Sequence, residues 1–424
     1  MKVCLISLGC AKNQVDSENL AGSLREAGHV LQDDVEGSDW AIVNTCGFIE
    51  AAVKESIDLI LDLEELKREG LVSHIAVVGC LYNRYDGDLV REFPTVDLWA
   101  FASDWKRVLA ALGSDFKRAR AMLPGDSPWS RYLKIAEGCD NRCSYCMIPS
   151  IRGKLSSMPL KAVIEEAERL VASGARELCL VAQDLTSYGM DWDGNSHLLE
   201  LLRILKRDLP EETWLRLLYL HPARLDEPFL EAVLVEGLAL PYLDIPIQHV
   251  DEAILTHMSR RVSEEGLRRV FSYARELNPD VALRTTVMVG FPGESEQSLL
   301  KLLTFLKDME IDRVGAFAFS PEDGTEASKM PGQISARVKE ERLQRVMELQ
   351  AEISLRRQMR MVGRCLKVLV LERDDDGTIL GRSYRDAPEV DGIVELVGEG
   401  LKTGEFVTAR VVEALEHDLV AEVV

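Results

Sequence analysis

Residues 132–146, YLKIAEGCDNRCSYC, decide the fold prediction for this 424-residue chain. An apolar run at 132–136 leads directly into a loop that carries Cys139, Cys143 and Cys146 with the spacing CxxxCxxC. A short apolar run that ends in a polar loop is typical of a buried strand. Because barrel active sites lie on the loops after their strands, the pattern indicates a functional loop at the carboxyl end of a first barrel strand.

The strand and helix pattern continues beyond this loop. A predicted helix at 160–173 stops at Gly174 and shows a helical spacing of apolar residues: Val163, Ile164, Ala167, Leu170 and Val171. Six strand–helix units predict an open, partial (β/α)6 barrel, because eight units need more chain. The predicted barrel strands are 132–136, 177–182, 214–220, 242–247, 282–289 and 313–319.

The two ends of the chain predict further domains, so the fold class is α/β multidomain. Alternating strands and helices before residue 113 predict a parallel α/β domain, with strands at 2–8, 40–45 and 74–79 and helices at 16–27 and 51–66. A long helix, 335–361, precedes short strands with Asp/Gly turns that predict a small β-barrel, at 366–371, 378–384, 392–396, 405–414 and 418–423. The predicted domains are 1–112, a linker at 113–130 without periodicity, 131–361 and 362–424.

Each predicted strand of the amino-terminal domain ends in a cysteine: Cys10, Cys46 and Cys80. The carboxyl edge of an open parallel sheet is where such folds bind ligands, so these three thiols are expected to meet at one rim. We call them the rim trio, and Cys139, Cys143 and Cys146 the motif trio. The alternative interpretation of the rim trio is three unrelated buried thiols.

Three closely spaced cysteines suit a four-iron, four-sulfur cluster, because they hold three irons and leave the fourth open. The open iron can chelate S-adenosylmethionine, whose reductive cleavage gives a radical able to take hydrogen from an unactivated carbon. The alternative is a structural zinc site, which needs four protein ligands, and no His or fourth Cys lies near the motif trio. A second open cluster on the rim trio suits the binding of a sulfur species.

The chain has nine cysteines, an odd number that argues against a disulfide framework in a chain of this length. Cys4 and Cys179 lie within apolar strands and Cys365 leads into one, so we predict that all three are buried structural thiols.

Charge and hydropathy limit the function classes. No run approaches the roughly 18 apolar residues that span a bilayer, and residues 1–10 lack a secretory pattern, so we expect a cytoplasmic protein. The formal net charge is −21. Residues 363–424 contain seven Lys/Arg and fourteen Asp/Glu. An RNA-binding barrel should be basic, so this barrel favours a basic protein partner and makes direct RNA binding less expected. The alternative is an acidic surface that merely keeps the chain soluble.

Three segments resemble the radical S-adenosylmethionine methylthiotransferases: GCAKNQVDSE at 9–18, YLKIAEGCDNRCSYCMIPSIRG at 132–153 and DIPIQHVDEAILTHMSRR at 244–261. The resemblance covers nearly the whole chain and implies a terminal TRAM barrel, two 4Fe-4S clusters and S-adenosyl-L-methionine. It further implies an electron donor such as flavodoxin or ferredoxin.

Within that family these three segments resemble those of the branch that methylthiolates the β-carbon of an aspartate in small-subunit ribosomal protein twelve. The tRNA-modifying branch usually has GCQMN where this chain has GCAKN at 9–13. The same chemistry on a tRNA adenosine stays open, as does a non-catalytic iron–sulfur carrier or RNA-binding module. No general acid or base is assigned from the sequence.

The resemblance also suggests contacts to S-adenosylmethionine. Gln183 and Gln248 end strands and can reach ribose hydroxyls, and Arg284 can pair with the methionine carboxylate. Tyr145 can lie against adenine or pack on the flank of the cluster. For each polar residue a solvated or structural role is the alternative.

Overall fold

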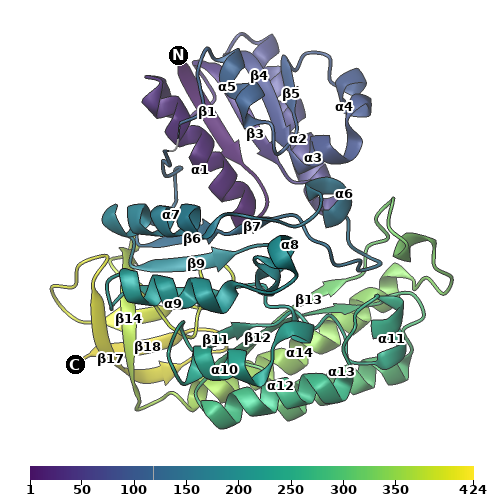
Figure 1. Cartoon of the computed structure of the whole chain (residues 1–424), viewed down its shortest axis with the longest axis vertical. Coiled ribbons are helices and arrows are strands. Elements are labelled where there is room, and N and C mark those ends of the chain that lie inside the picture. The colour runs from purple at the N-terminus through teal and green to yellow at the C-terminus, as the bar shows by residue number, and fades with distance from the viewer. Residues whose placement is uncertain (118) are drawn as a thin grey trace. The chain divides into compact units, whose positions relative to one another are not determined.

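The computed structural model describes residues 1–117 and 119–424, and the chain divides into two units (Figure 1). The first contains Met1–Asp126, Glu137–Asn141 and Cys146–Ser156, and the second contains Ser127–Ala136, Arg142–Tyr145 and Ser157–Val424. The division after Asp126 falls inside the predicted linker 113–130, of which residue 118 lies outside the described residues.

A five-stranded parallel sheet with the order β2-β1-β3-β4-β5 is the centre of the first unit. The three strands predicted from the sequence are confirmed as its central members, and two three-residue edge strands are additional. These edge strands are too short to show periodicity. The strands are β1 (Lys2–Ser7), β2 (Val30–Gln32), β3 (Ser38–Thr45), β4 (Val72–Gly79) and β5 (Leu98–Ala100).

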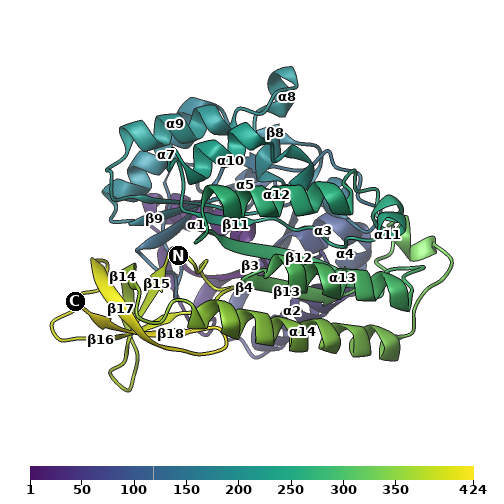
Figure 2. The same ribbon diagram turned by 90° about the horizontal axis from the view of Figure 1, so that it is seen from below.

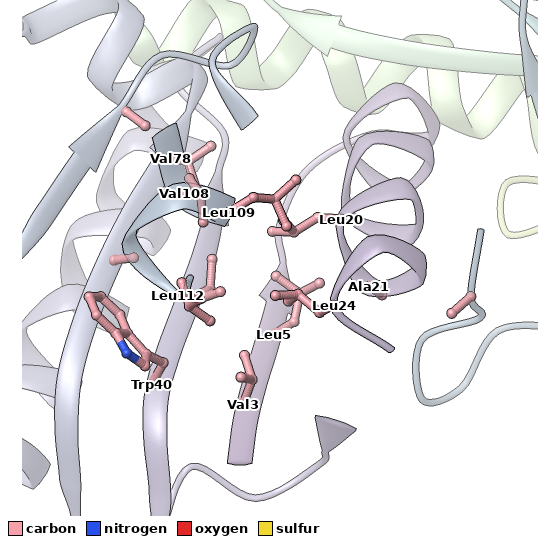
Figure 3. Close-up of a cluster of buried hydrophobic side chains, with 14 residues drawn as sticks. Val3, Leu5, Leu20, Ala21, Leu24, Trp40, Val78, Val108, Leu109 and Leu112 are labelled. Atoms are coloured by element: carbon pink, nitrogen blue, oxygen red, sulfur yellow. The ribbon is translucent and has the colours of Figure 1, made fainter. Parts of the chain in front are cut away.

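Helices cover both faces of this sheet. On one face Leu20 and Leu24 of α1 pack against Val3 and Leu5 of β1, together with apolar residues of α5 (Figure 3). On the other face Ile60 and Leu63 of α2 enter a second apolar cluster. Each fully buried Leu contributes roughly 1.5–3 kcal/mol relative to an exposed one. The helices are α1 (Ala11–Glu26), α2 (Glu50–Arg68), α3 (Cys80–Tyr85), α4 (Gly87–Glu92) and α5 (Trp105–Ala111).

Helix α1 begins five residues before the predicted start at residue 16. Its first turns bury polar side chains, among them Asn13 and Ser17, so apolar periodicity could not reveal them. The segment after residue 118 packs along the same helix, because Ala121 N–H donates to the Glu18 carbonyl and Arg120 pairs with the Glu18 carboxylate.

The second unit contains the predicted partial barrel, built as two three-stranded parallel sheets, β6-β9-β10 and β11-β12-β13. Between β10 and β11 the regular ladder of hydrogen bonds is interrupted. Isolated hydrogen bonds, such as that from the Leu220 N–H to the Asp244 carbonyl (2.9 Å), connect the two sheets there. The strands are β6 (Ser130–Lys134), β9 (Glu177–Val181), β10 (Trp214–Leu217), β11 (Tyr242–Asp244), β12 (Ala282–Val289) and β13 (Arg313–Ala318).

Helices alternate with these strands as predicted, and α7 buries Val163, Ala167 and Leu170. The main helices are α7 (Leu160–Ala172), α9 (Leu198–Asp208), α10 (Glu227–Leu234), α12 (Glu264–Leu277), α13 (Glu296–Met309) and α14 (Ala336–Met359). Shorter elements are α6 (Ile148–Arg152), α8 (Met190–Asp193), α11 (Glu252–His257), the 3-10 turns Leu185–Ser187, Pro222–Arg224 and Ala327–Lys329, and the pair β7 (Ala136–Glu137) and β8 (Ser156–Ser157).

The carboxy-terminal strands close into a five-stranded barrel, which confirms the predicted small barrel (Figure 2). Its strands are β14 (Cys365–Arg373), β15 (Ile379–Ser383), β16 (Val394–Val397), β17 (Phe406–Ala414) and β18 (Leu419–Val423). The prediction that Cys365 is buried is wrong. Leu366 and Val368 point inward along β14, so the alternation of a strand leaves Cys365 and Lys367 exposed.

Buried ion pairs join the small barrel to the amino ends of the partial-barrel strands. Glu177, the first residue of β9, pairs with Arg216 (2.7 Å) and Arg382. Asp312 accepts from Arg275 and Arg385 and has a pKa far below its usual range, because these cations outweigh the effect of its burial. The small barrel therefore covers the end of the strands opposite to their ligand-binding loops.

Glu177→Gln should weaken the second unit and change its response to acid. Burial alone would raise the pKa of Glu177, but Arg382 and Arg216 lower it from 4.5 to about 2. The stabilisation is therefore complete above pH 4.5 and is lost as the pH falls toward 2, which corresponds to on the order of 3 kcal/mol. Denaturant titrations should show a loss of about 3–5 kcal/mol for the variant at neutral pH.

The acid response separates this cause from general damage. Between pH 4.5 and 2 the free energy of unfolding should fall less in the variant than in the unaltered chain. The control is Glu341→Gln, which removes an exposed pair with Arg337 and should change stability by less than about 0.5 kcal/mol. Equal acid slopes for Glu177→Gln and the unaltered chain would contradict the assignment.

Candidate functional site

The rim trio lies at the carboxyl ends of three adjacent strands. Cys10 caps the start of α1 after β1, Cys46 follows β3, and Cys80 follows β4 and begins α3. In a doubly wound sheet of this strand order, ligands bind outside the carboxyl ends where the chain direction switches, between β1 and β3. Cys10 and Cys46 therefore border that crevice.

Two glycines let the cysteine loops approach one another. A Cβ added to Gly9 would lie 2.9 Å from the Cys46 Cβ and 3.2 Å from its Sγ. A Cβ added to Gly47 would lie 2.7 Å from the Cys80 carbonyl oxygen. Contacts under 3.0 Å to the Cys46 Cβ and to the Cys80 backbone leave no room for a side chain at Gly9 or Gly47, so both glycines are required for these loops to meet.

The protonation of the rim trio differs from thiol to thiol. Desolvation by neighbouring atoms would raise the pKa of Cys10, but Lys12, the N–H of Asn13 and Arg152 lower it below its usual value. Burial raises the pKa of Cys46, and it raises the pKa of Cys80 to about 11 despite the opposing effect of Arg152. Binding of a thiolate-ligated metal group must therefore release protons from buried thiols.

Arg152, the last residue of α6, has a guanidinium group beside the rim trio. Its Nε donates to the Cys80 Sγ (3.1 Å), and its Nη1 donates to Asp16 (3.0 Å) and Glu137 (3.2 Å). Its Nη2 donates to Asn13 Oδ1, and its side chain is only 4% exposed. Sequence analysis missed this residue, because its partner Cys80 lies 72 positions away and no local pattern points to it.

The motif trio occupies the loop between β7 and α6, as predicted. Two of its thiols accept hydrogen bonds from within the loop: Asn141 Nδ2 donates to Cys139 Sγ (3.3 Å) and the Ile148 N–H donates to Cys146 Sγ (3.4 Å). Such donors stabilise a thiolate. Met147, which follows Cys146, packs with Ile151 against Cys80, so the motif segment in the first unit contacts a rim cysteine.

Cys143 and Tyr145 belong to the second unit. The Cys143 Sγ lies 4.0 Å from Nη1 of Arg260, a buried arginine that sequence analysis also missed. Tyr145 packs against an apolar cluster that includes Met258 and Phe291. Both predicted roles of Tyr145, contact with adenine and packing on the flank of the iron–sulfur cluster, stay predictions.

The predicted cofactor residues lie at different levels of the partial barrel. Gln183 follows β9, and Gln248 adopts a positive φ of 69° while its N–H donates to Thr286 of β12. Arg284 lies near the amino end of β12, five residues before its carboxyl end, or about 17 Å at the usual rise of a strand. Gln248 forms a bridge with Val287, three positions after Arg284 in β12.

Arg284 already has carboxylate partners in its own chain. It pairs with Asp244 (3.0 Å) and with Asp391 (3.4 Å) of the loop between β15 and β16. It lines a cavity of about 260 Å³ together with Arg313 and Asp391. Its predicted contact with a methionine carboxylate stays untested.

A polar group at the carboxyl ends of β9 and β10 was identified only in part from the sequence. Asp184 accepts from Arg224 (2.6 Å), Thr186 and Ser187. Burial lowers the pKa of His221 to about 4, and Arg260 acts in the same direction, so this imidazole is neutral at pH 7. These side chains can offer hydrogen bonds to a polar ligand.

The two trios fit iron–sulfur clusters in donor chemistry. Residues 1–117 and 119–424 contain no set of three or more His, Cys, Asp or Glu side chains that converge as ligands of a single metal ion. A four-iron cube spreads its thiolate ligands around its own body, so its ligands need not converge on one point. Three thiols, the N–H donors to sulfur and the close glycine loops are the features that such a group needs.

Comparisons with known proteins agree with this site. Family models described as "Uncharacterized protein family UPF0004", "Radical SAM superfamily" and "TRAM domain" match residues 2–100, 133–306 and 362–424. Solved structures of the radical S-adenosylmethionine methyltransferase TsrM from Kitasatospora setae and of the radical enzyme OxsB share the fold. TsrM has a TM-score of 0.55 and 15% identity over 74% of this chain and 72% of its own. OxsB has a TM-score of 0.53 and 10% identity over 82% of this chain and 56% of its own.

The fold and the CxxxCxxC loop define a radical S-adenosylmethionine enzyme. Proteins named ribosomal protein uS12 methylthiotransferase RimO are similar to the whole chain: that of Geobacter sulfurreducens is 40% identical over 100% of this chain and 98% of its own length. The protein of that name from Heliobacterium modesticaldum is 40% identical over 100% of this chain and 95% of its own length. The chain belongs to the RimO-type radical S-adenosylmethionine methylthiotransferase family.

Gly47→Ala should remove metal from the rim trio while leaving the motif trio loaded. The new Cβ would meet the Cys80 carbonyl at 2.7 Å, so the loops that carry Cys46 and Cys80 must separate. After anaerobic reconstitution we expect a fall from about eight to about four irons per chain. The control is Gly87→Ala in the same unit, where an added Cβ meets nothing within 4 Å. Full iron content in Gly47→Ala, with a native circular dichroism spectrum, would contradict the prediction.

Proposed function

We propose that the protein adds a methylthio group to the β-carbon of an aspartate in ribosomal protein uS12. The observation that carries the proposal is identity of about 40% over the full chain with several relatives that bear that name. The acidic carboxy-terminal barrel supports a basic protein substrate through complementary charge.

The proposal includes two 4Fe-4S clusters and S-adenosyl-L-methionine as cofactors. Cys139, Cys143 and Cys146 would hold one cluster, and the other three ligands are Cys10, Cys46 and Cys80. When bound, these groups supply the one-electron chemistry and the sulfur that acid–base side chains lack. Among the contacts to S-adenosylmethionine we place Tyr145, Gln183, Gln248 and Arg284.

The chain's own residues orient the motif sulfurs, offer hydrogen bonds to a ligand and close one end of the barrel. Asn141 and the Ile148 N–H fix two motif sulfurs, and Arg260 holds a positive charge beside Cys143. Asp184 and the neutral His221 present hydrogen-bonding groups at the carboxyl ends of β9 and β10. The small barrel closes the amino ends of the strands through Glu177, so a substrate must approach from the loop side.

A flavodoxin or ferredoxin is the proposed electron donor, and the cytoplasm is the proposed location. No helix among residues 1–117 and 119–424 is long and apolar enough to cross a membrane. Direct binding of RNA is disfavoured by the net charge of −21, because phosphate contacts need clustered Lys and Arg.

Cys143→Ala should abolish release of 5′-deoxyadenosine from S-adenosylmethionine under reducing conditions, because the motif trio loses a cluster ligand. Chromatography of the reaction mixture measures the product. Cys365→Ala, which changes an exposed thiol of the small barrel, should release as much as the unaltered chain. Release of product by Cys143→Ala, or none by the unaltered chain, would favour a non-catalytic carrier.

The reconstituted enzyme should modify uS12 and not tRNA. Incubation with each substrate, followed by mass spectrometry, should show the mass gain of a methylthio group on an aspartate-containing peptide of uS12. Modification of tRNA alone would replace the proposed substrate by an adenosine, the second candidate within the same family.

A further inference from the structure

The rim trio combines a buried thiol, Cys80, with the half-buried Cys46 and the exposed Cys10, beside the buried side chain of Arg152. Three thiolates bound to a cluster place negative charge next to Asp16 and Glu137, whose carboxylates lie 3.0 and 3.2 Å from Arg152. Burying charges of one sign is costly unless an opposite charge lies among them. Arg152 supplies that charge, and its electrostatic effect reaches Cys10, Cys46 and Cys80.

The hydrogen bonds of Arg152 also fix the geometry of the trio. Its Nε contacts the Cys80 sulfur, and its Nη2 contacts Asn13. Asn13 Nδ2 in turn donates to the Leu8 carbonyl (2.9 Å) and the Thr45 carbonyl (3.1 Å), the residues just before the Gly9–Cys10 and Cys46 loops. One guanidinium thus connects all three cysteine loops.

Arg152 comes from the motif segment and not from the sheet that carries the rim trio. It lies six positions after Cys146, and α6 packs on α3 through Met147 and Ile151 against Cys80. The end of α6 also orients the side chain, because Gly153, with a φ of 78°, ends the helix and its carbonyl accepts from the Cys139 N–H (3.1 Å).

We propose that Arg152 is a positioning residue for the rim centre, whose guanidinium holds the Cys80 and Asn13 loops together and offsets the negative charge of the bound cluster. This inference rests on the proposed presence of an iron–sulfur centre on the rim trio. Reduction adds one negative charge to the centre, so the cation stabilises the reduced state more than the oxidised state and raises the reduction potential.

The test isolates the rim centre in the full chain by changing Cys139, Cys143 and Cys146 to Ala. Arg152→Gln, Arg152→Lys and Asp16→Asn are then introduced singly, and each chain is reconstituted anaerobically. Iron content and a redox titration followed by electron paramagnetic resonance are measured. The control is Arg120→Gln, which breaks a buried pair with Glu18 on the same helix as Asp16.

Arg152→Gln should bind less iron than the unaltered background and shift the midpoint potential to more negative values. Arg152→Lys keeps the positive charge but loses the planar set of N–H donors. Compared with Arg152→Gln, it should therefore recover more of the midpoint potential than of the iron content. Asp16→Asn removes a negative charge and should shift the potential in the opposite direction. Arg120→Gln should leave the potential unchanged.

An unchanged potential in both Arg152 variants, or shifts of the same sign in Arg152→Gln and Asp16→Asn, would overturn the inference. Loss of iron in Arg120→Gln equal to that in Arg152→Gln would reduce the role of Arg152 to general stability. If Arg152→Gln does not fold, the Asp16→Asn variant decides: a shift of the midpoint potential to more positive values supports the inference, and no shift or a negative one overturns it. Absence of any centre in the unaltered background would instead overturn the proposed function of the rim trio.

Discussion

Parallel strands end at the same edge of a sheet, and the rim of the first unit depends on that constraint. Cys10, Cys46 and Cys80 are separated by more than thirty residues in the chain, yet each follows a strand of the same central group. The order β2-β1-β3-β4-β5 places two of them beside the switch in chain direction. Glycines at 9 and 47 then remove the side chains that would keep the loops apart.

Three thiols at one rim, of which Cys80 is buried and Cys46 half-buried, repel one another as thiolates, and fixed cations and N–H donors offset that repulsion. Burial holds Cys46 and Cys80 protonated in the absence of metal, because a thiolate loses its hydration there. Arg152 opposes that effect at both thiols, and the first turn of α1 lowers the pKa of Cys10. The motif trio shows the same arrangement on a smaller scale, with N–H donors on Cys139 and Cys146 and Arg260 near Cys143.

The second unit separates the stability of the barrel from its chemistry. Buried ion pairs of Glu177 and Asp312 join the small barrel to the amino ends of the strands, where a fully buried carboxylate is stable only among several arginines. The segments after the carboxyl ends of its strands carry Cys143, Asp184 and His221. Arg284 pairs with Asp244 and with Asp391 of the small barrel, so it contributes to the same network of ion pairs.

The sequence by itself determined the strands and the cysteines. Apolar runs at 40–45 and 282–289 became β3 and β12, and the cysteines of the rim and motif trios follow strands as predicted, because periodicity and spacing are local properties. Only the tertiary structure decided the partners: Arg152 reaches Cys80 across 72 positions, and Arg260 reaches Cys143 across 117. It also exposed Cys365, since the face of a strand is set by the barrel that closes around it. Contacts between distant segments follow from packing in three dimensions, and no short-range pattern in the chain records them.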